Sequence, residues 1–304
     1  MSYSFLRESK LYIVYGGNKY RIHTSTAISF SQTFASDSYS VKTLHNQSKM
    51  FEGATITKAN PANFNFDVPL TIEKDESPVV DLLSELNNSQ LTSFDMYVQT
   101  GSAVFKLSNA VITSGSFDIN PRTQFTVQLQ GEGTKLERVG DESYSIPGSL
   151  ASESATRTPL LVYPVVSIDS LDMNNIISTT VTIENSIEWT KYDTLQASLN
   201  VTNASNIMRP SNYTVDNRTI SGAVRQYQTD NNITQFDDFS TNSNITLKAI
   251  QVGNAATATP FLQMSINPAT FTSRMETGDT YAQSYDFRNL DNSTTVPNII
   301  TQYS

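Results

Sequence analysis

The pentapeptide Ile119-Asn120-Pro121-Arg122-Thr123 recurs as Ile266-Asn267-Pro268-Ala269-Thr270, at an offset of 266 − 119 = 147 residues in a chain of 304. A second pair of similar segments lies earlier in each half, in the same order. Residues 28–34 and residues 181–187 share an alternation of apolar and polar side chains, and their offset is 181 − 28 = 153. Similar segments in the same order at a similar spacing predict two copies of one structural unit.

The composition favours an all-β protein. Hydrophobic residues make up 38% of the chain and charged residues only 16%, so Ser, Thr, Asn and Gln supply much of the remainder. Hydroxyl and amide side chains suit polar strand faces and turns, whereas helical bundles rely on Ala, Leu, Glu and Lys. The 15 Phe and 14 Tyr residues provide bulky core groups, which argues against disorder throughout.

Charge and cysteine content exclude several classes of function. A net charge of −9 with no visible basic patch argues against a protein that grips nucleic acid from outside. No cysteine is present, so disulfides, thiolate catalysis and cysteine-ligated metals are excluded. The sequence has no signal-peptide pattern and no run of about 18 apolar residues that could span a bilayer, so we expect folding in a reducing cytoplasm.

Residues 1–136 are predicted to form a first β-domain with an N-terminal arm. Period-2 alternation predicts a strand over residues 26–34, and the polar stretch 35–53 predicts a long loop or an extended hairpin. Further alternation over 54–74 continues the sheet. The last strands of this domain are expected at residues 93–99, 103–113 and 116–129, with turns at Gly101 and Gly115.

One helix is predicted between these strands. Ser77 is a plausible N-cap and Pro78 suits the first helical position. An apolar stripe at helical spacing follows, so one side of the helix should pack on the sheet; the stripe is Val79, Leu82, Leu83 and Leu86.

Residues 137–159 read as a linker because they are rich in Gly, Pro, Ser and Ala. Residues 160–304 are predicted to form the second β-domain and to repeat the order of the first, with a loose tail from residue 289. The loop 190–211 corresponds to 35–53, and a weaker helix slot lies at 232–239. The strands of this domain are expected at 160–167, 178–189, 212–215, 219–227, 245–252 and 261–273.

Candidate catalytic and metal-binding residues do not assemble into a known motif. His23 and His45 lack the partners of a catalytic triad, and no zinc-binding spacing is present. The carboxylates of residues 73–76 and of Asp237-Asp238 are interpreted as acids that favour a helix N-terminus. The single tryptophan, Trp189, is expected to pack in a core or an interface. We therefore expect no enzyme activity, no cofactor and no metal site.

The order of elements resembles the tail tube proteins of long-tailed bacteriophages. The resemblance rests on the period-2 strand with Ile28, Phe30, Gln32 and Phe34 on one face, the long polar loop, the alternating strands, the Pro-started helix and the final hairpin. It covers roughly residues 20–136 and 160–288. It implies tandem tail-tube-like β-sandwich domains, rings whose sheets join into an inner β-barrel, and stacked rings that form a conduit for DNA.

The resemblance also implies partners and contact surfaces. Two tube domains imply a homotrimeric ring with pseudo-sixfold symmetry, with a homohexamer as the alternative. Loops 35–53 and 190–211 would contact adjacent subunits or rings. The residues that we expect at these contacts are Tyr39, Val41, Leu44, Met50, Phe51, Trp189, Tyr192 and Leu195.

The sequence thus predicts a major tail tube subunit of the virion, assembled in the host cytoplasm, that forms the channel for DNA ejection. Its partners would be its own copies, the tape measure, terminator and distal tail proteins, and double-stranded DNA in transit, with no membrane. The alternatives are another phage tail, baseplate or decoration β-protein, or a carbohydrate-binding or glycan-cleaving β-protein. A chain with one Trp supplies little for the last of these.

Deletion of residues 38–48 tests the predicted role of the first long loop. We expect the shortened chain to fold, because the deleted segment is polar, but to lose contacts between rings and hence polymerisation. Electron microscopy and far-ultraviolet circular dichroism check the two parts of this prediction. Normal filaments from the deletion variant would contradict the role assigned to the loop.

Overall fold

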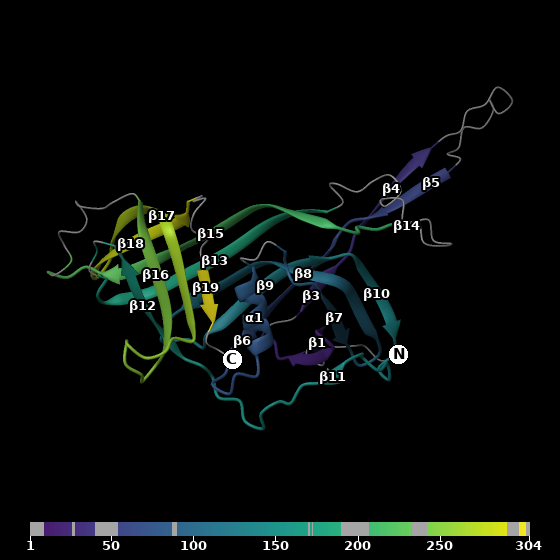
Figure 1. Cartoon of the computed structure of the whole chain (residues 1–304), viewed down its shortest axis with the longest axis horizontal. Helices are drawn as coiled ribbons and strands as arrows, with labels where there is room; N and C mark the ends of the chain where they lie inside the picture. The colour runs from purple at the N-terminus through teal and green to yellow at the C-terminus, as the bar shows by residue number, and fades with distance from the viewer. Residues whose placement is uncertain are drawn as a thin grey trace.

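Long strands dominate the computed structural model, and two of them join its two halves (Figure 1). The model describes residues 9–25, 28–39, 54–86, 90–169, 171, 173–189, 207–230, 232, 242–290 and 298–301. Within these residues there are nineteen strands and one helix, so the predicted all-β class is confirmed.

In the first half, a short helix interrupts a series of strands. The helix and strands up to the predicted linker are β1 (Lys10–Tyr15), β2 (Asn18–Ile22), β3 (Ser29–Ser31), β4 (Phe34–Tyr39), β5 (Ala54–Ala59), β6 (Ala62–Pro69), α1 (Ser77–Glu85), β7 (Phe94–Gln99), β8 (Val104–Ile119), β9 (Thr126–Gly133) and β10 (Lys135–Gly140). The four residues of the predicted apolar stripe of α1 are all buried, as expected. The N-cap is Glu76 and not Ser77, which is the first helical residue.

The second half contains longer strands than predicted. The short β11 (Ser149–Leu150) lies in the predicted linker, and β12 (Val162–Ile168), β13 (Ile176–Trp189), β14 (Ile207–Met208), β15 (Tyr213–Tyr227), β16 (Asn242–Gln251), β17 (Leu262–Thr277), β18 (Tyr281–Asn289) and β19 (Asn298–Thr301) follow. The two strands expected at 212–215 and 219–227 are one strand, β15. The expected loose tail contains β19, which pairs with β17. The weaker helix slot at 232–239 lies outside the described residues, apart from Asn232.

Gly115 lies inside β8, so the turn predicted there is wrong. A Cβ atom on Gly115 would lie 2.4 Å from Cδ1 of Leu83, a buried side chain of α1. The glycine therefore lets the helix approach the sheet and does not reverse the chain. The reversal comes at residues 120–123, where the side chain of Asn120 accepts a hydrogen bond from the amide of Arg122 at 3.0 Å.

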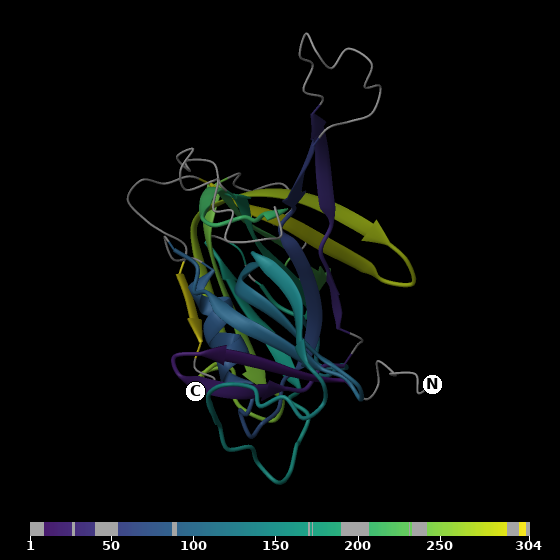
Figure 2. The same ribbon diagram turned by 90° about the vertical axis from the view of Figure 1, so that its right-hand side faces the viewer.

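The predicted strand 26–34 is interrupted after β3. At this interruption, the side chain of Gln32 bonds to backbone groups of neighbouring segments. Its Nε2 donates to the carbonyl of Asn60 and its Oε1 accepts from the amide of Leu136, both at 2.9 Å. Beyond Gln32, β4 pairs with β5 in a hairpin that projects from the body of the protein (Figures 1 and 2). The extended-hairpin reading of 35–53 is confirmed for these two strands, and residues 40–53 lie outside the described residues.

The two pentapeptides that suggested a repeat do not occupy equivalent positions. Residues 119–123 end β8 and form the turn after it, whereas residues 266–270 lie within β17. The order of strand pairing nevertheless recurs. In the first half, ladders connect β3, β6, β9, β8, β7 and β1 in that order, and in the second half they connect β13, β15, β18, β17, β16 and β12.

A ladder between β8 and β13 joins these two series into one sheet. Ser114–Ile119 of β8 pair antiparallel with Thr179–Glu184 of β13. A single hydrophobic core cluster accordingly extends through both halves, from Leu11 to Phe287. The two halves are therefore parts of one continuous structure along this ladder.

Replacing Gly222 with alanine tests how closely the second half is packed. A Cβ atom there would lie 2.1 Å from the carbonyl oxygen of Thr180 and 2.5 Å from the ring of Phe287. We expect Gly222→Ala to lower the free energy of unfolding by about 1–3 kcal/mol, because the backbone or the ring must shift. Urea denaturation measures this change. Gly278→Ala is the matched control, since its Cβ would have a nearest neighbour at 3.8 Å, and equal losses for both variants would contradict the packing argument.

Candidate functional site

One face of the joined sheet is polar across eight adjacent strands. Directly opposite residues of an antiparallel pair place their side chains on the same face, so the ladders define rows across the sheet. One row is Asp67, Gln128, Ser116, Thr182, Ser221, Arg288 and Thr270. The next row is Ser29, Asn65, Gln130, Ser114, Glu184 and Thr219. We call these rows and their same-face neighbours the polar face.

The opposite face of the same strands is apolar. Next to the first polar row, on the side away from the second, the ladders place Val68, Val127, Phe117, Val181, Gly222, Phe287 and Phe271 side by side. The hydrophobic members of this row are buried, and α1 packs on this side through Leu83. Period-2 alternation thus gives the sheet one dry face and one wet face, as expected for strands that cover a core on one side only.

The polar face is hollowed where the two halves meet. A cavity of about 510 Å³ lies over β8, β9 and β13, and its walls include Ser116, Asp118, Gln128, Thr180 and Thr182. Hydroxyl, amide and carboxylate groups therefore surround a concave surface. Such a surface holds water and presents no large apolar patch to a passing molecule.

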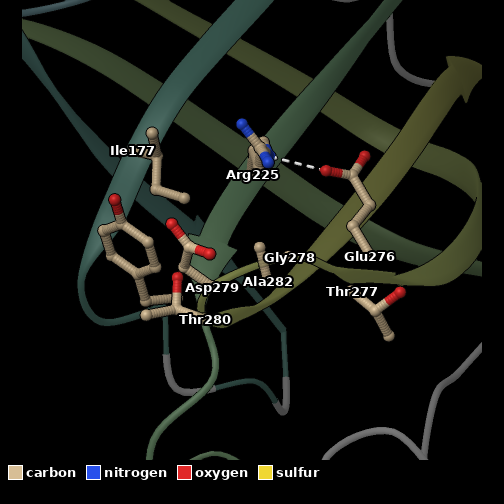
Figure 3. Close-up of a pocket in the computed structure, with 9 residues that line it drawn as sticks. Ile177, Arg225, Glu276, Thr277, Gly278, Asp279, Thr280 and Ala282 are labelled. Carbon is tan, nitrogen blue, oxygen red and sulfur yellow. Dashed lines mark ion pairs between the residues drawn. The ribbon is translucent and has the colours of Figure 1, made fainter.

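Charges on the polar face are unevenly distributed. Asp67, Asp118 and Glu184 lie on the strands from β6 to β13, whereas Arg225, Arg274 and Arg288 lie on β15, β17 and β18, together with Glu276 and Asp286. Glu132 of β9 lies on this face too, so three arginines against six carboxylates give 3 − 6 = −3 among the described residues. Glu276 accepts from both Arg225 at 2.7 Å and Arg274 at 3.4 Å, and the first of these ion pairs is visible in Figure 3. Desolvation raises the pKa of Asp118 above its ordinary value.

The carboxylates of residues 73–76 bind the predicted linker, and the side chain of the N-cap residue Glu76 makes no capping hydrogen bond to the helix. Glu73 accepts hydrogen bonds from the hydroxyl and the amide of Thr158 at 2.6 and 2.7 Å, and these bonds lower the pKa of the Glu73 carboxyl. Asp75 accepts from Ser154. Buried Glu76 pairs with Arg157. The interpretation of these acids as helix-dipole partners stays a prediction, and what the structure adds is their contacts with the linker.

Trp189 packs within the chain, between the two halves. Its Nε1 donates to Oε2 of Glu132 at 2.6 Å, and its ring contacts Tyr213 edge-on with centroids 5.3 Å apart. Tyr213 in turn bonds to the backbone of Leu91. The role of Trp189 in a contact between subunits stays a prediction, and what the structure adds is its place at the joint between first-half and second-half strands.

Of the other predicted contact residues, the structure describes only Tyr39. Tyr39 ends β4, where the backbone alone is described. The residues Val41, Leu44, Met50, Phe51, Tyr192 and Leu195 lie outside the described residues, so their predicted contacts remain predictions. The polar face itself was not predicted residue by residue, although the alternation along each strand carries its signal.

The histidines show no catalytic arrangement in the described part of the chain. Nε2 of His23 lies 3.1 Å from Oε2 of Glu153, so this residue joins the contacts that hold the linker. His45 lies outside the described residues. Among the residues that the structure covers, no helix is both long and apolar enough to cross a bilayer.

A β-sheet with one wet face and with strand edges open to pairing is typical of a structural protein that associates with further copies or partners. The family model described as the Bacteriophage Baseplate Tube Protein Family matches residues 1–303 of this chain. The chain therefore belongs to that family, and it is a structural protein of the phage tail or baseplate and hence of the virion. A search of curated protein sequences returned no match.

Replacing Asp118 with asparagine tests the polar face through its pH dependence. Because the folded chain raises the pKa of this carboxyl, ionisation costs stability once the pH exceeds the ordinary value of about 3.9. We expect Asp118→Asn to unfold at a higher urea concentration than the parent chain near pH 7. This advantage should vanish as the pH falls below the ordinary pKa, where Asp118 is neutral in both states.

Asp141→Asn is the control of opposite sign. Hydrogen bonds from Ser143 lower the pKa of Asp141, so its ionised form favours the folded chain above the ordinary pKa. Its replacement should lower the urea midpoint near neutral pH. Two variants that change the midpoint in the same direction would contradict the opposite environments assigned to these carboxylates.

Proposed function

We propose that this chain is a ring-forming tube subunit of the phage tail, and that its polar face lines the channel through which DNA passes. The observation that carries the proposal is the continuity of the polar face across strands of both halves. A sheet with a wet face and a dry, covered face can enclose an aqueous channel, because each side already meets its preferred solvent.

The width of the sheet supports a ring of three copies. The strands that share the polar face are β3, β6, β9, β8, β13, β15, β18 and β17, which is eight per chain. For strands ~4.8 Å apart and tilted by ~40°, twenty-four strands close at a backbone diameter of ~48 Å, and side chains on both walls leave ~36 Å. Two copies leave only ~20 Å by the same estimate, about the width of a DNA duplex. Three is thus the smallest number that gives clearance.

The charges of the polar face support passage and not capture. A lining with more carboxylates than arginines repels phosphates on average, so DNA has little reason to stop there. The three arginines are dispersed over three strands, and two of them are paired with Glu276. Electrostatic attraction at any one place is therefore weak.

The recurrent strand order supports two tandem tube-type domains, residues 1–136 and 160–304, joined by the linker 137–159. Strands β8 and β17 have the same length of 16 residues and the same place in the two series of ladders. Three chains with two such domains each would give a ring with sixfold pseudosymmetry. A homohexamer would contain twelve domains and a much wider channel.

The position of the ring in the tail separates two candidate functions. The family description favours a tube segment at the baseplate, and this is our first candidate. The second candidate is the major tail tube subunit, which the projecting β4–β5 hairpin favours because such a hairpin can reach an adjacent ring (Figure 2). A baseplate segment should form short stacks, whereas a major tube subunit should form long filaments.

Gold labelling of assembled rings tests the proposed lining. The chain has no cysteine, so an introduced thiol is unique. We expect Thr182→Cys, on the polar face, to place a small maleimide–gold label on the ring axis in end-on electron micrographs. Ala155→Cys, in the exposed linker on the helix side, should place the same label at the periphery. Failure of the purified chain to form rings, or a peripheral label on rings of the Thr182→Cys variant, would overturn the proposal.

A further inference from the structure

Among the strand edges that have no ladder partner within the described residues, two border the polar face. β3 pairs on one side with β6, and its other edge is open. β17 pairs with β16 only up to Thr270, and the end of that edge, Thr272–Thr277, is also open in the part of the chain that the structure covers. We infer that β3 of a second copy of this chain pairs antiparallel with Thr272–Thr277 of the first, in the register that the ladder between β8 and β13 sets inside each chain.

This inference rests on the proposed ring, and the internal ladder is its template. β7 pairs with one edge of β8 along the first part of that strand, and β13 pairs with the same edge further along. β17 is covered by β16 along its first part in the same way. The two strands match residue for residue at an offset of 262 − 104 = 158. The segment of β17 that corresponds to the partner-bearing segment of β8 is therefore the open one.

The correspondence of β3 with β13 follows from the ladders. Gly115 pairs with Leu129, which pairs with Phe66; Ser273 pairs with Tyr285, which pairs with Val224. Since 273 − 115 and 224 − 66 are both 158, these two ladders match. Two residues before Phe66 and Val224, Phe64 faces Phe30 and Gly222 faces Val181. Phe30 therefore corresponds to Val181.

Transferring the pairs of the internal ladder gives the register of the external one. Inside the chain, Val181 lies opposite Phe117, and Thr182 lies opposite Ser116. Between chains, Phe30 would lie opposite Met275. The full set of predicted pairs is Ile28 with Thr277, Ser29 with Glu276, Phe30 with Met275, Ser31 with Arg274, Gln32 with Ser273 and Thr33 with Thr272.

The side chains at the open edge fit this register. Phe117 is the counterpart of Met275, and it is only 4% exposed because β13 pairs beside it. Met275 is 42% exposed, although it lies on the same face as buried Phe271. Phe30 is partly buried against the core and can extend it across the joint. On the other face, Ser31 would lie beside Arg274, and the polar face would continue into the next chain. Pairing thus covers an exposed apolar side chain and satisfies open backbone groups.

A cavity marks the open edge at the corresponding place. It measures about 230 Å³ and is lined by Glu276 and Thr277 of β17, by Ala282 of β18 and by Arg225 and Tyr227 of β15 (Figure 3). Glu276 corresponds to Asp118, which lines the larger cavity at the internal joint. The two cavities therefore share one corresponding wall, although the smaller one extends over β18 to β15 and the larger one to β13.

Pairs of introduced cysteines test the register. Ser31→Cys combined with Arg274→Cys should give intermolecular disulfides under mild oxidation, with a non-reducing ladder that ends at the trimer, because opposite residues of antiparallel strands lie within disulfide reach. Ser116→Cys combined with Thr182→Cys is the internal reference, since these counterparts face each other within one chain and should cross-link in the monomer. Ser31→Cys combined with Glu276→Cys shifts the register by two residues and should cross-link severalfold less.

Substitutions at Met275 give a second readout that does not depend on oxidation. Met275→Asp should abolish rings and leave the thermal midpoint of the monomer nearly unchanged, because this side chain is exposed in one chain alone, and Met275→Leu should keep the rings. Rings that cross-link equally through the shifted pair, or that survive Met275→Asp, would overturn this joint and leave the proposed tube intact. Absence of rings from the parent chain would instead overturn the proposed function.

Discussion

The structure depends on the antiparallel ladder between β8 and β13, because this ladder turns two series of strands into one sheet. Six residues on each strand pair across it, from Ser114–Ile119 to Thr179–Glu184. The apolar face then runs without a break from the first half to the second, and so does the polar face. Without this ladder, Phe117 and Val181 would both lie at open edges, and the core could not continue between the halves.

The wet and dry faces explain how one sequence can serve both folding and assembly. Burial of the apolar face, with α1 packed on it, stabilises the individual chain. The polar face needs no cover, so it stays available as the wall of a water-filled channel. The alternation of apolar and polar side chains therefore agrees with membership of the phage baseplate tube family. It also supports the proposed channel lining. The linker contacts of Glu73, Asp75 and Glu76 then fix the path between the halves.

Much of the fold could be predicted from the sequence, because helical and period-2 patterns reflect burial directly. The stripe of α1 and the strands around Val68 and Val181 are examples. The turn predicted at Gly115 is wrong because this glycine makes room for the side chain of Leu83, a residue distant in the sequence. The repeated pentapeptide indicates two units. The feature that the two halves share is the order in which their strands pair, and no single segment of sequence contains that order. The polar face required the ladder registers, since alternation alone does not tell which strands are neighbours.

The linker has a consequence for the thermodynamics of assembly. A ring of six tube units made from separate chains would need five bimolecular steps, each with its own loss of translational and rotational freedom, before the sixth joint closes the ring. In a ring of three chains, half of the joints are intramolecular and form when the chain folds, at the high effective concentration that a tether provides. Arg157 and Thr158 of the linker bind to Glu76 and Glu73 of the first half, so the effective tether is shorter than the linker itself. In the proposed ring, covalent fusion of the units would therefore move three of five losses of translational and rotational freedom from assembly to synthesis of the chain.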